Sequence, residues 1–355
     1  MKFGVDHATN SCLLMHKLED LIKSSMLADS LGYDSVFFMD HLNWTPVSSQ
    51  IANNWILSSY LINKLKQAGL GILVTDPHRY HPAVLTQMHA TMDNLTDGKF
   101  ILGIGAGEGA NLNQFGINWE KPVSRLREAI EVMQELWQAK SNKRANYEGK
   151  FFTLKDAFLQ IKFKHPPQLY IAGNGPKTRE LTAKYGTGWF PNSITYNLYS
   201  KWCREIDKHA EKFGRNKQDI VRAYQIYVYI SENEEEAFNT LRPIMTVFAL
   251  KEEMIKEYNL KFPNDMSFHK MVTYNTIVGM KKAQRKVFEY SQYVPDSIIE
   301  EMCAYGSIDN IIKKFELFIK AGVKYFVLMF IGKNYYQQIE EFMKKIIPYF
   351  QENDT

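Results

Sequence analysis

The sequence predicts an α/β fold, a (β/α)8 TIM barrel with an insertion before the last strand. Short apolar runs rich in β-branched and aromatic residues alternate with segments of helical periodicity along most of the 355 residues. The apolar runs are nearly continuous, as in parallel strands that are buried on both faces. Roughly eight such strand–helix units favour a closed barrel over an open doubly wound sheet.

The first half of the chain supplies four of these strands. In order, we expect strand 2–6, helix 17–31, strand 35–39, strand 71–74, helix 82–95, strand 100–104 and helix 124–137. Leu18 and Ile22 recur at helical spacing in the first helix, and Gly32 closes it. Pro82 suits the first turn of the second helix. The segment between 40 and 70 reads as polar and irregular.

The second half supplies the other strands and the insertion. In order, we expect a short β excursion at 146–163, strand 168–172, helix 176–185, strand 188–191, helix 198–213, strand 220–230, helix 307–321, strand 325–331 and helix 335–350. Strand 220–230 is rich in Val, Ile and Tyr. The segment at about 233–300 has Lys- and Met-rich helical stretches and is predicted to be an insertion. No linker is apparent, so we expect a single domain spanning 1–355.

Composition excludes several classes of function. Apolar residues make up 45% and charged residues 23%, which is typical of a soluble globular protein. The net charge is +4 and the 43 basic residues are dispersed, which speaks against nucleic acid as a partner. Cys12, Cys203 and Cys303 form no pair or CxxC motif, so we expect no disulfide, no metal site and a reducing cytoplasm. No apolar run approaches the ~20 residues of a membrane span, and the polar N-terminus is no signal peptide.

Polar residues follow most of the predicted strands. In barrels of this kind the active site forms at the C-terminal ends of the strands. The residues at those positions are Asp6, His7, Asp40, His41, Thr75, Asp76, Gly105, Ala106, Gly107, Glu108, Gly173, Asn174, Gly175, Asn192 and Ser193. Any one of them alone could be structural, but their recurrence at so many strand ends favours a functional site.

Two glycine-rich loops lie among these strand ends. GIGAGEG (103–109) lacks the spacing of a dinucleotide-binding fingerprint. It is either a tight turn or a backbone that a flat ligand approaches closely beside Glu108, and we favour the second interpretation. AGNGPKTRE (172–180) opens a predicted helix, with Pro176 in its first turn and Lys177 next to it. Because helix N-termini bind phosphate, we favour a phosphate site over an ordinary turn.

Taken together, these segments resemble the luciferase-like superfamily of flavin- and coenzyme F420-dependent oxidoreductases. The stretches that carry the resemblance span nearly the whole chain. They are DSVFFMDHLNW (34–44), VTDPHRYHPAVLTQ (74–87), GKFILGIGAGEGANLNQFG (98–116), RLREAIEVMQELW (125–137), PQLYIAGNGPKTRELTAKYGTGW (167–189) and GSIDNIIKKFELFIKAGVKYFVL (306–328).

The resemblance implies a homodimer that binds the ring of F420, or alternatively of FMN, at the C-terminal mouth of the barrel. It implies a cis peptide bond between Leu73 and Val74 behind the ring, and a cofactor phosphate on the loop 173–177. The cofactor-binding residues that it implies are Trp44, Leu73, Val74, Thr75, Gly105, Ala106, Gly107, Asn111, Ala172, Gly173, Asn174, Gly175, Pro176 and Lys177.

The chain mixes features of two subgroups within this superfamily. The alcohol and sugar-phosphate dehydrogenases have a Trp four residues after the His, whereas Trp44 comes three residues after His41. The methylenetetrahydromethanopterin reductases have an acidic residue on the first strand, to which Asp6 is similar. They also have an Asp-His-x-x-Asn pattern, to which the segment that begins at Asp40 is similar. In this chain the pattern is shorter, because Asn43 lies two residues after His41. No Lys follows the sixth strand, which speaks against a sugar-phosphate substrate.

The expected activity is hydride transfer between F420 and a small organic substrate, either a one-carbon unit on a methylenetetrahydromethanopterin-type carrier or a secondary alcohol or ketone. We expect Asp40 and His41 to handle the proton, with the carboxylate orienting the imidazole. Glu108 is expected beside the ring, and Asp6 is a second candidate acid. One alternative is an FMN-dependent monooxygenase that receives reduced flavin from a partner reductase. Another is a barrel that binds a flavin or a protein without catalysis.

Overall fold

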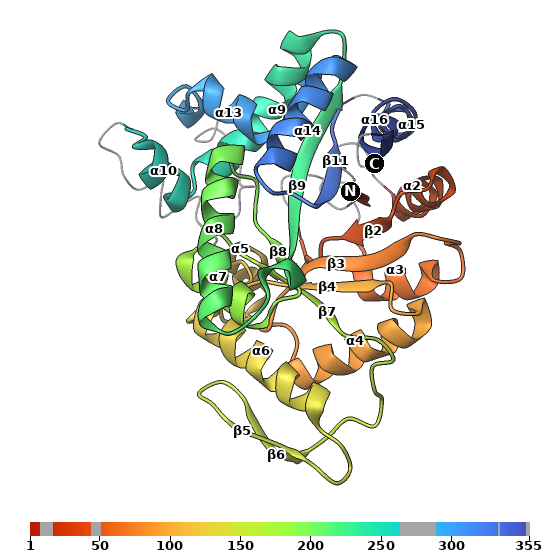
Figure 1. Ribbon diagram of the computed structural model, residues 1–355, viewed down its shortest axis with the longest axis vertical. Helices are drawn as coiled ribbons and strands as arrows, with labels where there is room; N and C mark the ends of the chain where they lie inside the picture. Colours follow the sequence, from red (N-terminus) through yellow and green to blue (C-terminus); the bar gives the residue numbers. More distant parts are fainter. Residues whose placement is uncertain (8–16, 44–50, 263–288, 333, 353–355) are drawn as a thin grey trace.

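The computed structural model describes residues 1–7, 17–43, 51–262, 289–332 and 334–352. In these ranges, eight parallel strands form a closed barrel, because β8 pairs with β9 at the end of the strand order. The barrel strands are β1 (Lys2–Asp6), β2 (Ser35–Phe38), β3 (Gly69–Thr75), β4 (Phe100–Ile104), β7 (Gln168–Ala172), β8 (Gly188–Phe190), β9 (Val221–Ile230) and β11 (Tyr325–Phe330). The predicted (β/α)8 barrel is confirmed (Figure 1).

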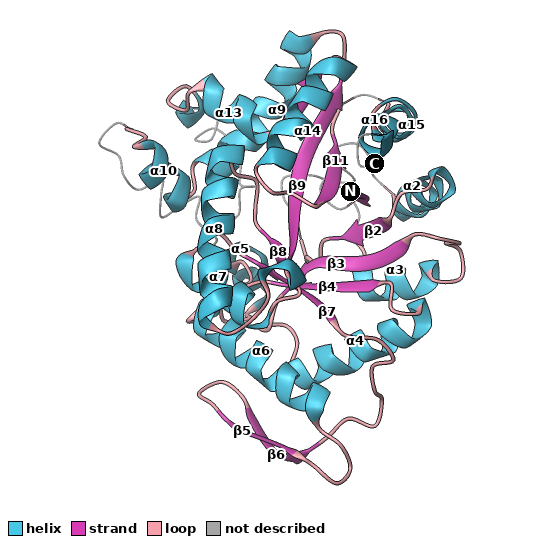
Figure 2. Ribbon diagram, in the orientation of Figure 1, coloured by secondary structure: helices cyan, strands magenta, loops and turns pink. Residues whose placement is uncertain are grey.

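Helices surround the barrel on its outer side (Figure 2). They include α2 (Leu18–Leu31), α3 (Asn54–Leu61), α4 (Pro82–Thr96), α6 (Pro122–Gln138), α7 (Pro176–Tyr185), α8 (Tyr196–Lys212), α14 (Ile308–Lys320), α15 (Tyr335–Lys345) and α16 (Ile347–Glu352). Gly32 ends α2 with a φ of 94°, as its predicted role as a cap requires. The short β excursion expected at 146–163 is an antiparallel pair of strands, β5 (Ala145–Glu148) and β6 (Thr153–Ala157), which lie apart from the barrel in Figure 1.

Helix α3 lies in the segment that the sequence predicted to be irregular, and that expectation was wrong. Asn53 caps the helix, because its side chain accepts a hydrogen bond from the backbone N–H of Ile56. Trp55 and Leu61 are buried in the core. The serines of NWILSSYL interrupt the apolar pattern, so the sequence signal for this short helix was weak.

The connection between β9 and β11 is longer than a simple crossover helix. It contains α9 (Glu234–Ala249), α10 (Glu252–Tyr258), α13 (Asp296–Met302), the short strand β10 (Ala304–Gly306) and then α14. Strand β10 pairs with the last residues of β9 and so extends the sheet beyond the barrel. The predicted insertion before the last strand therefore corresponds to added helices at this end of β9 (Figure 1).

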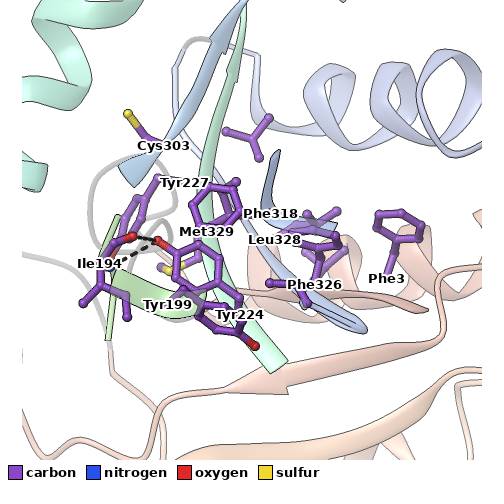
Figure 3. Close-up of a cluster of buried hydrophobic side chains, with 14 of the residues drawn as sticks. Phe3, Ile194, Tyr199, Tyr224, Tyr227, Cys303, Phe318, Phe326, Leu328 and Met329 are labelled. Carbon is purple, nitrogen blue, oxygen red and sulfur yellow. Dashed lines mark hydrogen bonds between the residues drawn. The ribbon is translucent and has the colours of Figure 1, made fainter. Parts of the chain in front are cut away.

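The long strand β9 is anchored by aromatic packing on its outer face. The ring of Tyr224 stacks on that of Phe318 from α14, with 4.3 Å between their centroids. Its hydroxyl is fully buried and lies within hydrogen-bond distance of the backbone of Ile194, which follows β8 (Figure 3). The inner side of the barrel has a second hydrophobic cluster. In it, the ring of Phe37 lies against the backbone of Gly71, and a Cβ on Gly71 would be 2.6 Å from that ring. This inner packing leaves the C-terminal strand ends as the place for polar side chains.

Cys203 and Cys303 are free and buried. Within the described ranges, no helix is both long enough and apolar enough to cross a membrane. The same ranges contain no cluster of three or more His, Cys, Asp or Glu side chains suited to a metal ion.

Candidate active site

The expected irregularity in the third strand is present. The register between β3 and β4 shifts between Ile72 and Thr75, and the peptide bond between Leu73 and Val74 within this bulge is cis. The carbonyl of Thr75 then accepts a hydrogen bond of 2.9 Å from the backbone N–H of Gly105. The bulge is therefore tied to the end of the neighbouring strand.

Three of the expected cofactor-binding residues meet at the mouth of the barrel. A Cβ on Gly105 would lie 3.1 Å from Val74 Cγ2 and 3.6 Å from Ala172 Cβ. These residues come from the ends of β3, β4 and β7. The three residues therefore lie close together on adjacent strands.

The loop after β4 is held by contacts on both sides. Gly107 has a φ of +74°, and a Cβ there would lie 3.1 Å from Asp76 Cβ. The indole N–H of Trp119 donates a 2.9 Å hydrogen bond to the carbonyl of Ala106. Asn111 is buried in the short helix α5 (Gly109–Leu112), and its side-chain oxygen accepts a hydrogen bond from the backbone N–H of Asn43. The loops after β2 and β4 are thus joined.

The carboxylate of Asp40 belongs to a buried network below the mouth. Its Oδ2 accepts a 2.7 Å hydrogen bond from the hydroxyl of Thr75 and a 3.3 Å bond from the indole of Trp55. Arg79 Nη2 also lies 3.3 Å from Asp40 Oδ2, and the exposed fractions of these two side chains are only 7% and 3%. These contacts are all made by Oδ2, and the expected role of Asp40 in orienting the imidazole of His41 stays a prediction.

Glu108 faces His41. The distance between His41 Nε2 and Glu108 Oε2 is 3.8 Å, and their side chains are 15% and 30% exposed. Burial lowers the pKa of His41 below its ordinary value, although the charge of Glu108 acts in the opposite direction. The site therefore pairs a neutral imidazole at the end of β2 with a partly exposed carboxylate at the end of β4.

Asp6 is buried at the end of another strand, β1. Its Oδ2 accepts a 3.0 Å hydrogen bond from the side-chain amide of Gln225 on β9, and both side chains are buried. The next residue, His7, lies 2.8 Å from the hydroxyl of Tyr335, and burial lowers its pKa to about 3. His7 is thus a neutral core histidine beside a buried acid.

The loop 173–177 leads from β7 into the first turn of α7. Gly173 has a φ of +141°, and Gly175 ends the loop as the N-cap of α7, with no side-chain cap on the first turn. Asn174 is only 3% exposed; its oxygen accepts from the backbone N–H of Asn192, while its Nδ2 has no hydrogen-bond partner among the described residues. Arg179 Nη1 bonds the carbonyl of Asn174.

Comparison with known proteins identifies the family. Residues 1–325 match the luciferase-like monooxygenase family. The chain belongs to this family.

Among curated relatives of this luciferase-like protein is the 5,10-methylenetetrahydromethanopterin reductase of Archaeoglobus fulgidus. It is 26% identical over 98% of this chain and 99% of its own length. A solved F420-dependent secondary alcohol dehydrogenase in complex with an F420–acetone adduct is 22% identical over 98% of each chain, with a TM-score of 0.81. A monooxygenase from Streptomyces bottropensis is 17% identical over 99% of this chain and 100% of its own, with a TM-score of 0.71.

The structure of this luciferase-like protein adds residues that the sequence analysis did not single out, namely Arg79, Trp119 and Gln225. A sequence signal existed for Arg79, because two acids at neighbouring strand ends, Asp40 and Asp76, need a counter-charge when they are buried. No comparable signal indicated Trp119 or Gln225. Trp44 lies outside the described residues, so its expected role as a cofactor-binding residue stays a prediction.

Proposed function

We propose that this protein is an oxidoreductase that uses coenzyme F420 to exchange a hydride with a small organic substrate, and that His41 and Glu108 handle the accompanying proton. The observation that carries the proposal is the His41–Glu108 pair at the rim of a mouth lined by Val74, Gly105 and Ala172. The relationship to F420-dependent enzymes over nearly the whole chain supports the choice of cofactor.

The residues present fit this cofactor at both ends. At the ring end, a Cβ on Gly105 would enter the space beside Val74 and Ala172. At the phosphate end, the first turn of α7 has no side-chain cap, and Nδ2 of Asn174 is a buried donor with no hydrogen-bond partner among the described residues. Lys177 is exposed next to this turn, where its charge favours an anion.

When bound, F420 supplies the hydride chemistry. The protein then has to accept or release one proton. The 3.8 Å between His41 Nε2 and Glu108 Oε2 is longer than a hydrogen bond. A substrate hydroxyl beside this pair can therefore donate its one hydrogen to His41 Nε2. In the oxidation of an alcohol, neutral His41 accepts the hydroxyl proton as the C–H hydride leaves, and Glu108 stabilises the imidazolium that forms.

This role predicts how turnover depends on pH. Burial lowers the pKa of His41 from 6.5, so the imidazole is neutral above that lowered pKa and protonated below it. We expect kcat/KM for substrate oxidation to fall as the pH decreases through the lowered pKa, with the acid limb below pH 6.5. The pH profile of kcat/KM measures this limb. An acid limb above pH 6.5, or one that persists in His41→Gln, would contradict the assignment.

The phosphate loop predicts a loss of cofactor affinity in Gly173→Ala. The φ of +141° disfavours any side chain, and the new Cβ would lie 2.5 Å from Thr178 Oγ1 in the first turn of α7. Since the loop must then move, we expect F420 to bind about tenfold more weakly. Fluorescence titration measures the change.

Gly214→Ala is a matched control for this variant. Gly214 has a φ of +67° but no atom within 4 Å of its would-be Cβ, and it is exposed beyond the end of α8. Its affinity for F420 should equal that of the parent chain. Equal affinities in both glycine variants would remove the loop 173–177 from the cofactor site.

The class of substrate is tested by supplying F420 with each candidate. We propose a one-carbon unit on a methylenetetrahydromethanopterin-type carrier first, because the reductase of Archaeoglobus fulgidus matches nearly the whole chain and Asp6 is buried at the end of β1. A secondary alcohol or ketone is the second candidate. A secondary alcohol is supplied with oxidised F420 and should cause a loss of F420 absorbance, whereas a ketone or the methylene carrier is supplied with reduced F420 and should cause a gain. A change with one class and not the other decides between them, and absence of turnover with both contradicts the proposed substrates.

The second candidate function is an FMN-dependent monooxygenase, because solved monooxygenases share this fold. It predicts oxygen consumption with reduced FMN from a partner reductase and no turnover of F420. An oxygen electrode distinguishes the two functions directly. The homodimer that the resemblance implies and the cytoplasmic location that the cysteine pattern indicates stay predictions; light scattering of the purified chain tests the former.

A further inference from the structure

Arg79 lies at the centre of the polar network under His41. Its Nε is 2.7 Å from Asp76 Oδ2, its Nη2 is 3.3 Å from Asp40 Oδ2, and it also bonds the backbone carbonyl of Asp40. Its side chain is 7% exposed and that of Asp76 is 8% exposed. A planar guanidinium can serve two carboxylates and a carbonyl at once, which the point charge of a lysine cannot do.

The same arginine also acts on the electrostatics of His41. The charged groups that face this imidazole from other described elements are Glu108 at the start of α5, and Asp76 and Arg79 after β3. Asp40 is its neighbour in the chain. The three carboxylates each raise the pKa of His41, whereas Arg79 lowers it. Because charges interact strongly where water is scarce, the guanidinium offsets carboxylates that would otherwise favour a protonated imidazole.

We propose that Arg79 is a positioning residue for the proton-handling site: it bridges Asp40 and Asp76, fixes the backbone that presents His41, and opposes with its charge the carboxylates around this imidazole. The consequence for catalysis rests on the proposed function of His41. The effect of Arg79 on the charge of the His41 side chain does not depend on that function.

The test is an NMR titration of the complete chain with 15N-labelled histidine, in which the His41 resonance is assigned by its absence in His41→Gln. Arg79→Met is expected to move the titration midpoint of His41 to higher pH, because it removes the positive charge and leaves both carboxylates. Arg79→Lys, which keeps the charge, is expected to return the midpoint toward that of the parent chain. A midpoint in Arg79→Met that is unchanged or lower would overturn the proposal.

If Arg79→Met does not fold, as judged by circular dichroism, the variant Asp76→Asn tests the proposal. Asp76→Asn removes one carboxylate while keeping an oxygen that can accept from Arg79, so it should move the His41 midpoint to lower pH. An unchanged or higher midpoint overturns the proposal.

Kinetics distinguish an electrostatic effect of Arg79 on His41 from a purely structural role. In Arg79→Met the acid limb of kcat/KM should move to higher pH together with the NMR midpoint, whereas a purely structural role would lower turnover at every pH without moving the limb. If His41→Gln keeps full turnover, the proposed function fails, yet the NMR midpoints still decide the role of Arg79.

Discussion

Replacing His41 by alanine will lower turnover by about 10²–10⁴-fold and leave F420 affinity largely unchanged. The reason is geometric. The imidazole faces Glu108 at 3.8 Å, whereas the proposed cofactor-binding residues Val74, Gly105 and Ala172 lie at the ends of other strands. Steady-state kinetics and a fluorescence titration on the same preparation measure the two quantities separately.

Two further variants sharpen this result. His41→Gln keeps a polar side chain but cannot exchange a proton at neutral pH, so it should lose most of the same activity. His209→Ala, near the end of α8, is the matched control and should keep parent activity. Unchanged turnover in His41→Ala, or an equal loss in His209→Ala, would contradict the assignment of His41.

Replacing Asp40 by alanine will destabilise the fold by about 3–5 kcal/mol. The change leaves Arg79 without one of its two carboxylates, and leaves the hydroxyl of Thr75 and the indole of Trp55 without their acceptor. Urea unfolding followed by circular dichroism measures the free energy of unfolding. Glu148→Ala, an exposed acid on β5, removes the same charge and should change stability by less than ~0.5 kcal/mol.

This variant also separates two interpretations of the Asp40–His41 sequence pair. If Asp40 were the direct partner of the imidazole, Asp40→Ala would remain as stable as the parent chain and lose activity as His41→Ala does. The network that the structure shows predicts instead that Asp40→Ala lowers the free energy of unfolding. Any loss of activity would then result from displacement of the backbone that carries His41.

Most of the barrel could be predicted from the sequence because its signals are local. Near-continuous apolar runs mark buried parallel strands, and residues such as Gly32 mark helix ends. The (β/α)8 pattern then places the residues that follow each strand at one end of the barrel. The cis bond at Leu73–Val74 had no local signal and came only from the family resemblance.

The partners of the strand-end side chains could not be predicted, because sequence order does not specify where a side chain points. Asp40 and His41 are adjacent in the chain, yet the carboxylate turns to Arg79 and the imidazole faces Glu108. Burial explains the choice: a carboxylate with almost no exposure needs several donors, which Arg79, Thr75 and Trp55 supply together. Such a choice depends on tertiary packing of segments far apart in the sequence.

Titration of the purified chain with F420 and, separately, with FMN, followed by the quenching of cofactor fluorescence, tests whether this luciferase-like protein uses F420 as proposed. We expect saturable binding of F420, weakened in Gly173→Ala and unchanged in Gly214→Ala, with no binding of FMN over the same concentrations. Tight binding of FMN without binding of F420 would contradict the proposal.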